Sequence, residues 1–257
     1  MLSQLREQVP WLQHVEWHPE LGSTQDRARE LVEASTQPLP FLIGADLQRG
    51  GRGRGKHRWW TGQGALAMSL VLDPTEFALQ PEAPLPPQLA LAVGVAVCHA
   101  VRAFISNESV GLHWPNDVYV GQRKLAGILT EALTPRRVII GIGLNSNNTL
   151  DEAPAELRAT AVTLRDLLGA PVDAEALLVS LLNELHAALR LLYEQPTELG
   201  REFAALAMQR GQMLLLRQGD QHHAGRCLGI AADGGLQLET ESGLRVFYSG
   251  TLSAEDL

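Results

Sequence analysis

The densest group of chemically useful side chains lies in residues 48–60, which read Gln-Arg-Gly-Gly-Arg-Gly-Arg-Gly-Lys-His-Arg-Trp-Trp. Glycines at alternate positions let the backbone turn freely and bring its N–H groups close to a ligand. The interleaved cations supply charge for an anion, and the closing tryptophans offer a flat face to a planar base. The pattern is typical of a phosphate-binding loop; the alternative is a flexible basic surface turn.

This basic loop belongs to an acidic protein. The chain has 257 residues and a net charge of −8, and five of its 21 lysines and arginines fall within residues 49–58. A negative net charge disfavours a nucleic-acid-binding protein, so the local positive charge indicates a small anionic substrate rather than a polymer. A hydrophobic content of 45% and a charged content of 19% are typical of a soluble globular enzyme.

The sequence predicts neither export nor membrane insertion. The N-terminus lacks a basic start followed by an apolar core, so we expect no secretory signal. The longest apolar run, residues 89–97, is too short to span a membrane. Cys98 and Cys227 lie far apart without metal-type spacing, and no metal site is predicted. We therefore expect a soluble, cytoplasmic protein.

The basic loop connects two predicted strands, residues 41–47 and 65–72. A short strand over residues 15–18 precedes them. Ser23 or Thr24 is a good helix N-cap, which predicts a helix that ends at about residue 34. A surface connection over residues 74–87 then leads into a nearly continuously apolar helix, residues 87–105, which we expect to be buried.

The middle of the chain predicts an antiparallel meander. Residues 115–117 form a Pro-Asn-Asp turn, and the strands that follow are expected at residues 118–120, 124–131 and 137–145.

The texture of the chain changes at residue 211. Before this point, helices are predicted for residues 154–168, 174–194 and 197–209. After it, short alternating strands are predicted for residues 213–217, 223–230, 236–240 and 244–249. We therefore expect two domains: residues 1–210, and a small β-barrel of residues 211–257.

Five short motifs occur in order along the chain. They are Ser23-Thr24-Gln25, the Gly-Arg-Gly-Arg loop with its tryptophan in residues 48–59, His-Trp-Pro-Asn-Asp at 113–117, Lys-Leu-Ala-Gly-Ile-Leu at 124–129, and Gly-Ile-Gly-Leu-Asn at 141–145. From about residue 15 onward the chain resembles the biotin protein ligases, also called biotin–[acetyl-CoA-carboxylase] ligases. The resemblance implies an α+β fold with a mixed, largely antiparallel sheet and flanking helices, like that of class II synthetases, followed by an SH3-like β-barrel.

The resemblance also implies a two-step reaction. Biotin's carboxylate attacks the α-phosphate of ATP, which gives biotinyl-5′-AMP and pyrophosphate. A lysine on the biotin carboxyl carrier domain of acetyl-CoA carboxylase, or of another biotin-dependent carboxylase, then attacks this mixed anhydride. Such chemistry needs no enzyme nucleophile, only two anions held together, charge stabilisation and exclusion of water. ATP with Mg²⁺ is implied without a dedicated protein metal cage, and the family pattern is compatible with a homodimer.

Three overlapping groups of site residues follow from the resemblance. Biotin is expected to contact Ser23, Thr24, Gln25, Gln48, Arg52, Gly53, Arg54, His113 and Gly127. The nucleotide is expected to contact Arg52, Arg54, Lys56, Trp59, Asn116, Asp117 and Asn145. Arg52, Arg54, His113 and Lys124 are the expected catalytic residues. The alternative for Asn116 is that it only shapes a turn, and for Gly127 that it only permits close packing.

Two positions depart from the family pattern. Lys56 and His57 stand where many bacterial members continue Arg-Gly-Arg, and His113 stands where the family has its catalytic lysine. Histidine has an unperturbed pKa of about 6.5, and a neighbouring triphosphate favours its protonated form. We predict an active enzyme in which His113 serves as a charged donor; an inactive biotin-binding protein is the alternative.

Other functions were weighed against this one. Lipoate and octanoate ligases or transferases share the expected catalytic fold, but octanoyl transferases need a cysteine nucleophile, and neither Cys98 nor Cys227 is suitably placed. A repressor needs a helix-turn-helix, and the residues before residue 15 are too few for one, so no DNA binding is expected. Lys56 and Lys124 are the only lysines, which indicates either codon bias or selection against self-labelling by an amine-reactive intermediate.

Overall fold

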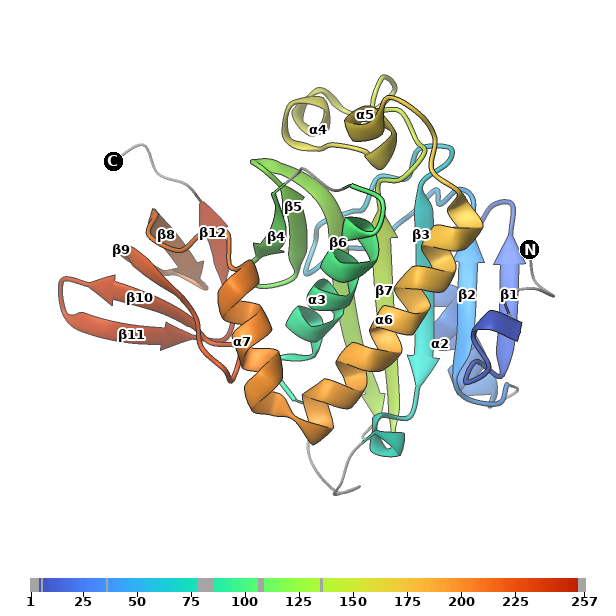
Figure 1. Cartoon of the computed structure of the whole chain (residues 1–257), viewed down its shortest axis with the longest axis horizontal. Helices are drawn as coiled ribbons and strands as arrows, with labels where there is room; N and C mark the ends of the chain where they lie inside the picture. Colours follow the sequence, from blue (N-terminus) through green and yellow to red (C-terminus); the bar gives the residue numbers. More distant parts are fainter. Residues whose placement is uncertain are drawn as a thin grey trace.

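The computed structural model describes residues 5, 7–35, 37–77, 86–105, 109–134 and 136–253. Within them a seven-stranded sheet of order β1-β2-β3-β7-β6-β5-β4 forms the centre of the larger domain (Figure 1). Its strands are β1 (His14–His18), β2 (Phe41–Ala45), β3 (Leu66–Leu72), β4 (Val110–His113), β5 (Asp117–Val120), β6 (Arg123–Thr134) and β7 (Arg137–Leu144). β1 and β2 pair in parallel and the other neighbours are antiparallel, so the expected mixed, largely antiparallel sheet is confirmed.

Side-chain alternation divides the sheet into two faces. Leu70 and Ile140 belong to the main core, which α3 (Leu89–Arg102) and α6 (Ala174–Glu194) cover (Figure 1). Val71 and Ile139, one residue along each strand, belong to a smaller cluster beneath α2 (Thr24–Ala34). Since successive side chains in a strand point to opposite faces, the second face is the one on which α2 lies.

α2 begins where the capping residues predict. Ser23 is extended, and its Oγ accepts from the Asp26 backbone N–H at 3.4 Å, which satisfies one of the free N–H groups of the first turn. Ser35 ends the helix in the left-handed conformation. The helix start therefore faces the strand end that carries the basic loop.

α6 is the one helix in the described part of the chain that is long and apolar enough to cross a membrane by length and composition alone. Half of that stretch is buried inside the protein, and its leucines pack on the equally apolar α3. We therefore describe α6 as a core helix. It leads into α7 (Pro196–Leu206), which ends three residues before the predicted residue 209.

The single helix predicted over residues 154–168 is wrong. The chain forms two short helices, α4 (Ala155–Thr160) and α5 (Leu164–Leu168). Between them Ala161 pairs with Lys124 of β6, and Thr163 Oγ1 accepts from the Asp166 N–H at 3.0 Å to begin a new helix. A strand contact and an internal N-cap thus break the periodicity that favoured one helix.

The connection predicted over residues 74–87 contains a 3₁₀ turn, η1 (Pro74–Glu76), and residues 78–85 lie outside the described residues. The strand predicted over 41–47 ends at Ala45, and β4 was not predicted as a strand.

A second, antiparallel sheet of order β11-β10-β9-β8-β12 forms the C-terminal part of the chain. Its strands are β8 (Met213–Gln218), β9 (Gln221–Ile230), β10 (Leu236–Thr240), β11 (Gly243–Phe247) and β12 (Thr251–Ser253). No pairing joins β11 to β12 within the described residues, so the expected barrel is an open sheet there. The sheet lies beside β4 and α7 (Figure 1), and the buried Trp114 Nε1 donates to the Gly234 carbonyl at 3.1 Å.

Candidate active site

A cavity of about 480 Å³ lies on the face of the large sheet that α2 only partly covers. Ser69 of β3, Gly127 of β6, and Gly141 and Gly143 of β7 line it. Ser69 is opposite Gly141 and Gly127 is opposite Gly143 in the strand pairing, so small residues cluster on this face. The apolar side chains that fill this face elsewhere are therefore replaced by space for a ligand.

The indole of Trp59 lies against this glycine-lined area. A Cβ added to Gly143 would come 2.3 Å from Trp59 Cε2, and one added to Gly127 would come 3.0 Å from Cζ3. Side chains larger than hydrogen at these positions would force the indole to move. The close-packing interpretation of Gly127 therefore has a geometric basis, and Gly127 also lines the cavity.

The other end of the cavity is a buried polar cluster. Gln48 Oε1 accepts from the Thr24 backbone N–H at 2.8 Å and from Thr24 Oγ1 at 3.1 Å. Ser69 Oγ lies 2.9 Å from Thr24 Oγ1 and 3.0 Å from Gln25 Oε1. Ser69 is fully buried, and Thr24 and Gln25 are each 3% exposed. Donors and acceptors fixed in this way suit a small polar ring, because each is already oriented by a neighbour.

The basic loop forms a short hairpin over the cavity. The Gly53 N–H donates to the His57 carbonyl at 2.9 Å, and the Trp59 N–H donates to the Gly51 carbonyl at 2.9 Å. Gly55, at the tip, has φ of +60°, a conformation that favours glycine. The hairpin thereby directs alternate cationic side chains toward the cavity.

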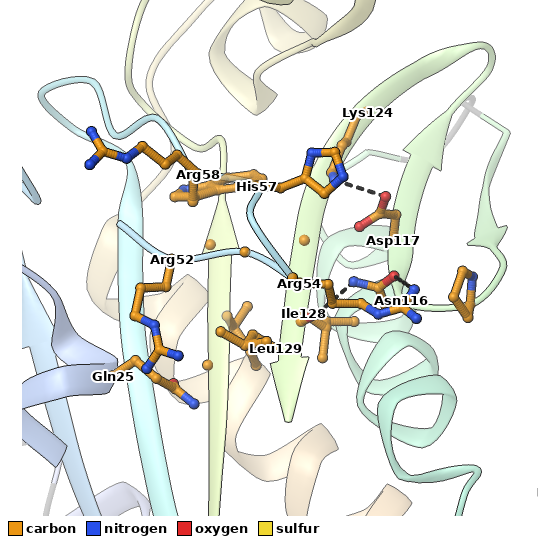
Figure 2. Close-up of a pocket in the computed structure, with 18 of the residues that line it drawn as sticks. Gln25, Arg52, Arg54, His57, Arg58, Asn116, Asp117, Lys124, Ile128 and Leu129 are labelled. Atoms are coloured by element: carbon orange, nitrogen blue, oxygen red, sulfur yellow. Dashed lines mark hydrogen bonds and ion pairs between the residues drawn. The ribbon is translucent and has the colours of Figure 1, made fainter. Parts of the chain in front are cut away.

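Two arginines of the hairpin bind opposite sides of the site (Figure 2). Arg52 donates to Glu131 at 3.0 and 3.2 Å and to Asp26 at 3.0 Å, and it lies over Gln25. Arg54 Nη1 donates to Asn116 Oδ1 at 3.1 Å.

Lys124 and Asp117 form an ion pair of 2.8 Å at the hairpin end of the cavity. The Lys124 ammonium also lies 5.6 Å from the centroid of the Trp59 ring, within the range of a cation–π contact. Asp117 Oδ1 is buried and has no hydrogen-bond partner among the described residues. The pair therefore combines a fixed cation with a carboxylate oxygen that is available to a ligand.

His113 ends β4 and stacks on Tyr119 of β5 at 4.3 Å between ring centroids. Burial lowers the pKa of His113, with Lys124 adding to the effect and Asp117 opposing it. Burial and Asp117 raise the pKa of Tyr119 to about 12. His113 is therefore neutral at pH 7 when the site is empty, and its charged form stays a prediction for the nucleotide-bound state.

The structure brings nearly all of the predicted site residues to one cavity. The lining includes Ser23, Thr24, Gln25, Gln48, Arg52, Gly53, Arg54, Lys56, Trp59, His113, Asn116, Asp117, Lys124 and Gly127. Asn145 is the exception: it is 4% exposed, lies just beyond β7 outside the lining, and its Oδ1 accepts from Asn148 Nδ2 at 3.4 Å. Its expected contact with the nucleotide has no support in this arrangement.

Sequence reasoning missed several residues of the site. Ser69 and Tyr119 line the cavity, Glu131 binds Arg52, and residues 250–252 of the C-terminal sheet reach the lining. A lone serine within the apolar run of β3 was an available signal for Ser69. The approach of the C-terminal sheet has no local sequence signal.

A sheet with a glycine-lined cavity, a cationic hairpin above it and a small C-terminal sheet define a protein ligase of the biotin or lipoate type. The model of the biotin/lipoate A/B protein ligase family matches residues 18–145, and that of the biotin protein ligase C-terminal domain matches residues 211–253. The chain belongs to this family, within its biotin protein ligase branch.

Relatives of known structure or sequence agree with this assignment. The bifunctional ligase/repressor BirA of Bacillus spizizenii is 32% identical over 246 residues, which are 93% of this chain and 74% of the relative. A biotin–[acetyl-CoA-carboxylase] ligase of Mycobacterium tuberculosis is 32% identical over 65% of this chain and 60% of its own length. The biotin protein ligase of Aquifex aeolicus in complex with biotin and ATP superposes with a TM-score of 0.81 at 29% identity, covering 93% of this chain and 97% of that one.

Proposed function

We propose that this protein activates biotin with ATP and transfers it to a lysine of a biotin carboxyl carrier domain, in acetyl-CoA carboxylase or another biotin-dependent carboxylase. One observation carries the proposal: a buried polar cluster and a set of cations share a single cavity. The cluster around Thr24 and Ser69 suits an uncharged polar ring, and Arg54, Lys56 and Lys124 lie where a carboxylate and a phosphate would meet. The Aquifex relative, solved with biotin and ATP, supports the same pair of substrates.

The first step needs no protein nucleophile. A carboxylate oxygen of biotin forms a bond to the α-phosphorus of ATP while the bond to pyrophosphate breaks, and both charges stay on the substrates. Fixed cations lower the barrier because they stabilise charge that spreads over the phosphate oxygens. Neither cysteine takes part, since Cys98 and Cys227 are buried away from the cavity, and burial raises the pKa of Cys98 to about 12.

Mg²⁺ is proposed to enter with the triphosphate. No three or more His, Cys, Asp or Glu side chains within the described ranges form a group that could hold a metal ion. Asp117 is the carboxylate in the cavity lining, and its buried Oδ1 has no hydrogen-bond partner in the described part of the chain. One carboxylate with substrate phosphates is the usual set of ligands for Mg²⁺, which would neutralise phosphate charge here.

In the second step the carrier lysine ε-amine attacks the biotinyl carbonyl carbon, AMP leaves, and the ammonium proton passes to solvent. We further propose that the protein acts in the cytoplasm, with this carrier domain rather than nucleic acid as its macromolecular partner, and its net charge of −8 supports the latter point. A gel-shift experiment at low salt that showed sequence-specific DNA binding would contradict it.

The proposed function is tested by mixing the purified protein with ATP, Mg²⁺, biotin and an isolated biotin carboxyl carrier domain. Mass spectrometry of the carrier should show one added biotinyl group on one lysine. A carrier that stays unmodified while pyrophosphate is released would restrict the activity to the first step, and no pyrophosphate release at all would refute the proposal.

A further inference from the structure

Glu131 of β6 interacts with three side chains beside the cavity. Its Oε2 accepts from Gln25 Nε2 at 2.8 Å, and its Oε1 accepts from Arg29 Nη2 at 3.1 Å. Arg52 donates to both oxygens, from Nη2 at 3.0 Å and from Nη1 at 3.2 Å. The Glu131 side chain is only 19% exposed, so these contacts are partly shielded from water. No residue-type argument at the sequence level singled it out.

The two-point contact occupies the part of Arg52 that a substrate anion needs. A guanidinium recognises a carboxylate or phosphate through a pair of its terminal N–H groups. In the empty site both terminal nitrogens of Arg52 face protein carboxylates, those of Glu131 and Asp26. Figure 2 shows the result: Arg52 points toward Gln25 and away from Arg54.

Exchange of Glu131 for a substrate anion would leave no unpaired charge behind. Once Arg52 turns away, Glu131 keeps its contacts with Arg29 and with the Gln25 amide. Removing the only partner of a shielded carboxylate is costly, whereas removing one of several is much less so. The network can therefore release Arg52 without losing the orientation of Gln25, which lies in the cavity lining.

We propose that Glu131 is a positioning residue that holds Arg52 while the site is empty and gives it up to the carboxylate of biotin. This rests on the proposed function. Glu131 does not touch the reacting atoms; it acts through Arg52, by competing with the substrate for the same guanidinium. It thus sets how tightly biotin binds and keeps the hairpin on the sheet before biotin arrives.

The variant Glu131→Gln tests this, because the glutamine oxygen can still accept from Gln25 while the charge that holds Arg52 is gone. Biotin binding without ATP, measured by calorimetry, should become about fivefold tighter, the effect of losing a competing ion pair worth about 1 kcal/mol. Trypsin should cut the unliganded variant after Arg52 or Arg54 about fivefold faster than the wild type. With saturating biotin the two proteins should be cut at the same rate.

Glu20→Gln is the matched control. Glu20 also binds an arginine of this loop, Arg49, at 2.5 and 2.8 Å, but neither residue lines the cavity. This variant should keep the wild-type affinity for biotin, so a gain that appeared in both variants would overturn the proposal.

Weaker or unchanged biotin binding in Glu131→Gln would also overturn the proposal, because a purely structural carboxylate lowers affinity and thermal stability when it is removed. If the glutamine variant shows no cooperative unfolding, Glu131→Asp replaces it; this shorter carboxylate should give the same faster cleavage, and a wild-type cleavage rate would refute the contact. A wild-type protein that binds no biotin contradicts the proposed function instead, and the trypsin rate without ligand still reports on the hold of Glu131 on Arg52.

Discussion

The charge state of His113 gives a prediction that pH can test directly. Burial lowers its pKa in the empty site, so the imidazole is neutral at pH 7 there. If a bound triphosphate needs a charged donor at this position, binding takes up one proton. Between the pKa of the empty site and that of the complex, the apparent affinity for ATP should then fall by about tenfold for each unit that pH rises.

The assay is the KM for ATP in pyrophosphate release between pH 6 and pH 8.5, for the wild type and for His113→Lys. Lysine stays charged over this range, and the ratio of the two KM values cancels the titration of the nucleotide itself. The ratio of wild-type to variant KM should rise with pH. A flat ratio would refute the charged role of His113.

The same shift has an opposite signature in the empty protein. Because the folded pKa of His113 lies below the unfolded value of about 6.5, the unfolded chain binds more protons in this window. The contribution of this residue to stability is therefore complete above about pH 6.5 and is lost as pH falls toward the folded pKa. Urea titrations of wild type and His113→Lys at pH 7.5 and 5.5 measure it.

Two further predictions concern packing. Gly143→Ala should displace Trp59, lower stability by about 1–3 kcal/mol and raise the KM for ATP, because the new Cβ would lie 2.3 Å from the indole; Gly22→Ala, where nothing lies within 4 Å, is the control, and an equal effect in both would argue against the clash. Trp114→Phe should cost about 1–3 kcal/mol, because the Gly234 carbonyl loses its 3.1 Å donor, and limited proteolysis should then release the C-terminal sheet earlier; unchanged proteolysis would show that this bond does not hold the two parts together.

Much of the catalytic domain could be predicted because its local signals agree with its tertiary structure. Ser23 caps the helix that it was expected to cap, and the meander strands fall where alternation placed them. The helix predicted over residues 154–168 failed because Ala161 joins a strand from a distant part of the chain. Propensity does not report such a contact.

The site was predictable where a motif carries the residue and not where only the fold does. Ser69 follows from the pairing of β3 with β7, which places it opposite Gly141, and that pairing is a property of the folded sheet. Glu131 lies on the same face as Gly127, but its partner Arg52 arrives from a hairpin whose position no local pattern sets. Asn145 was expected from its motif, yet it is turned away from the cavity lining.

The central claim is that this cavity activates biotin with ATP. Pyrophosphate release with ATP and Mg²⁺, compared between biotin, lipoate and octanoate as the only acid, tests it most directly. The account predicts release with biotin at a rate far above that with either alternative, and loss of that rate in Arg54→Ala. Faster release with lipoate or octanoate, or an Arg54→Ala variant as active as the wild type, would contradict it.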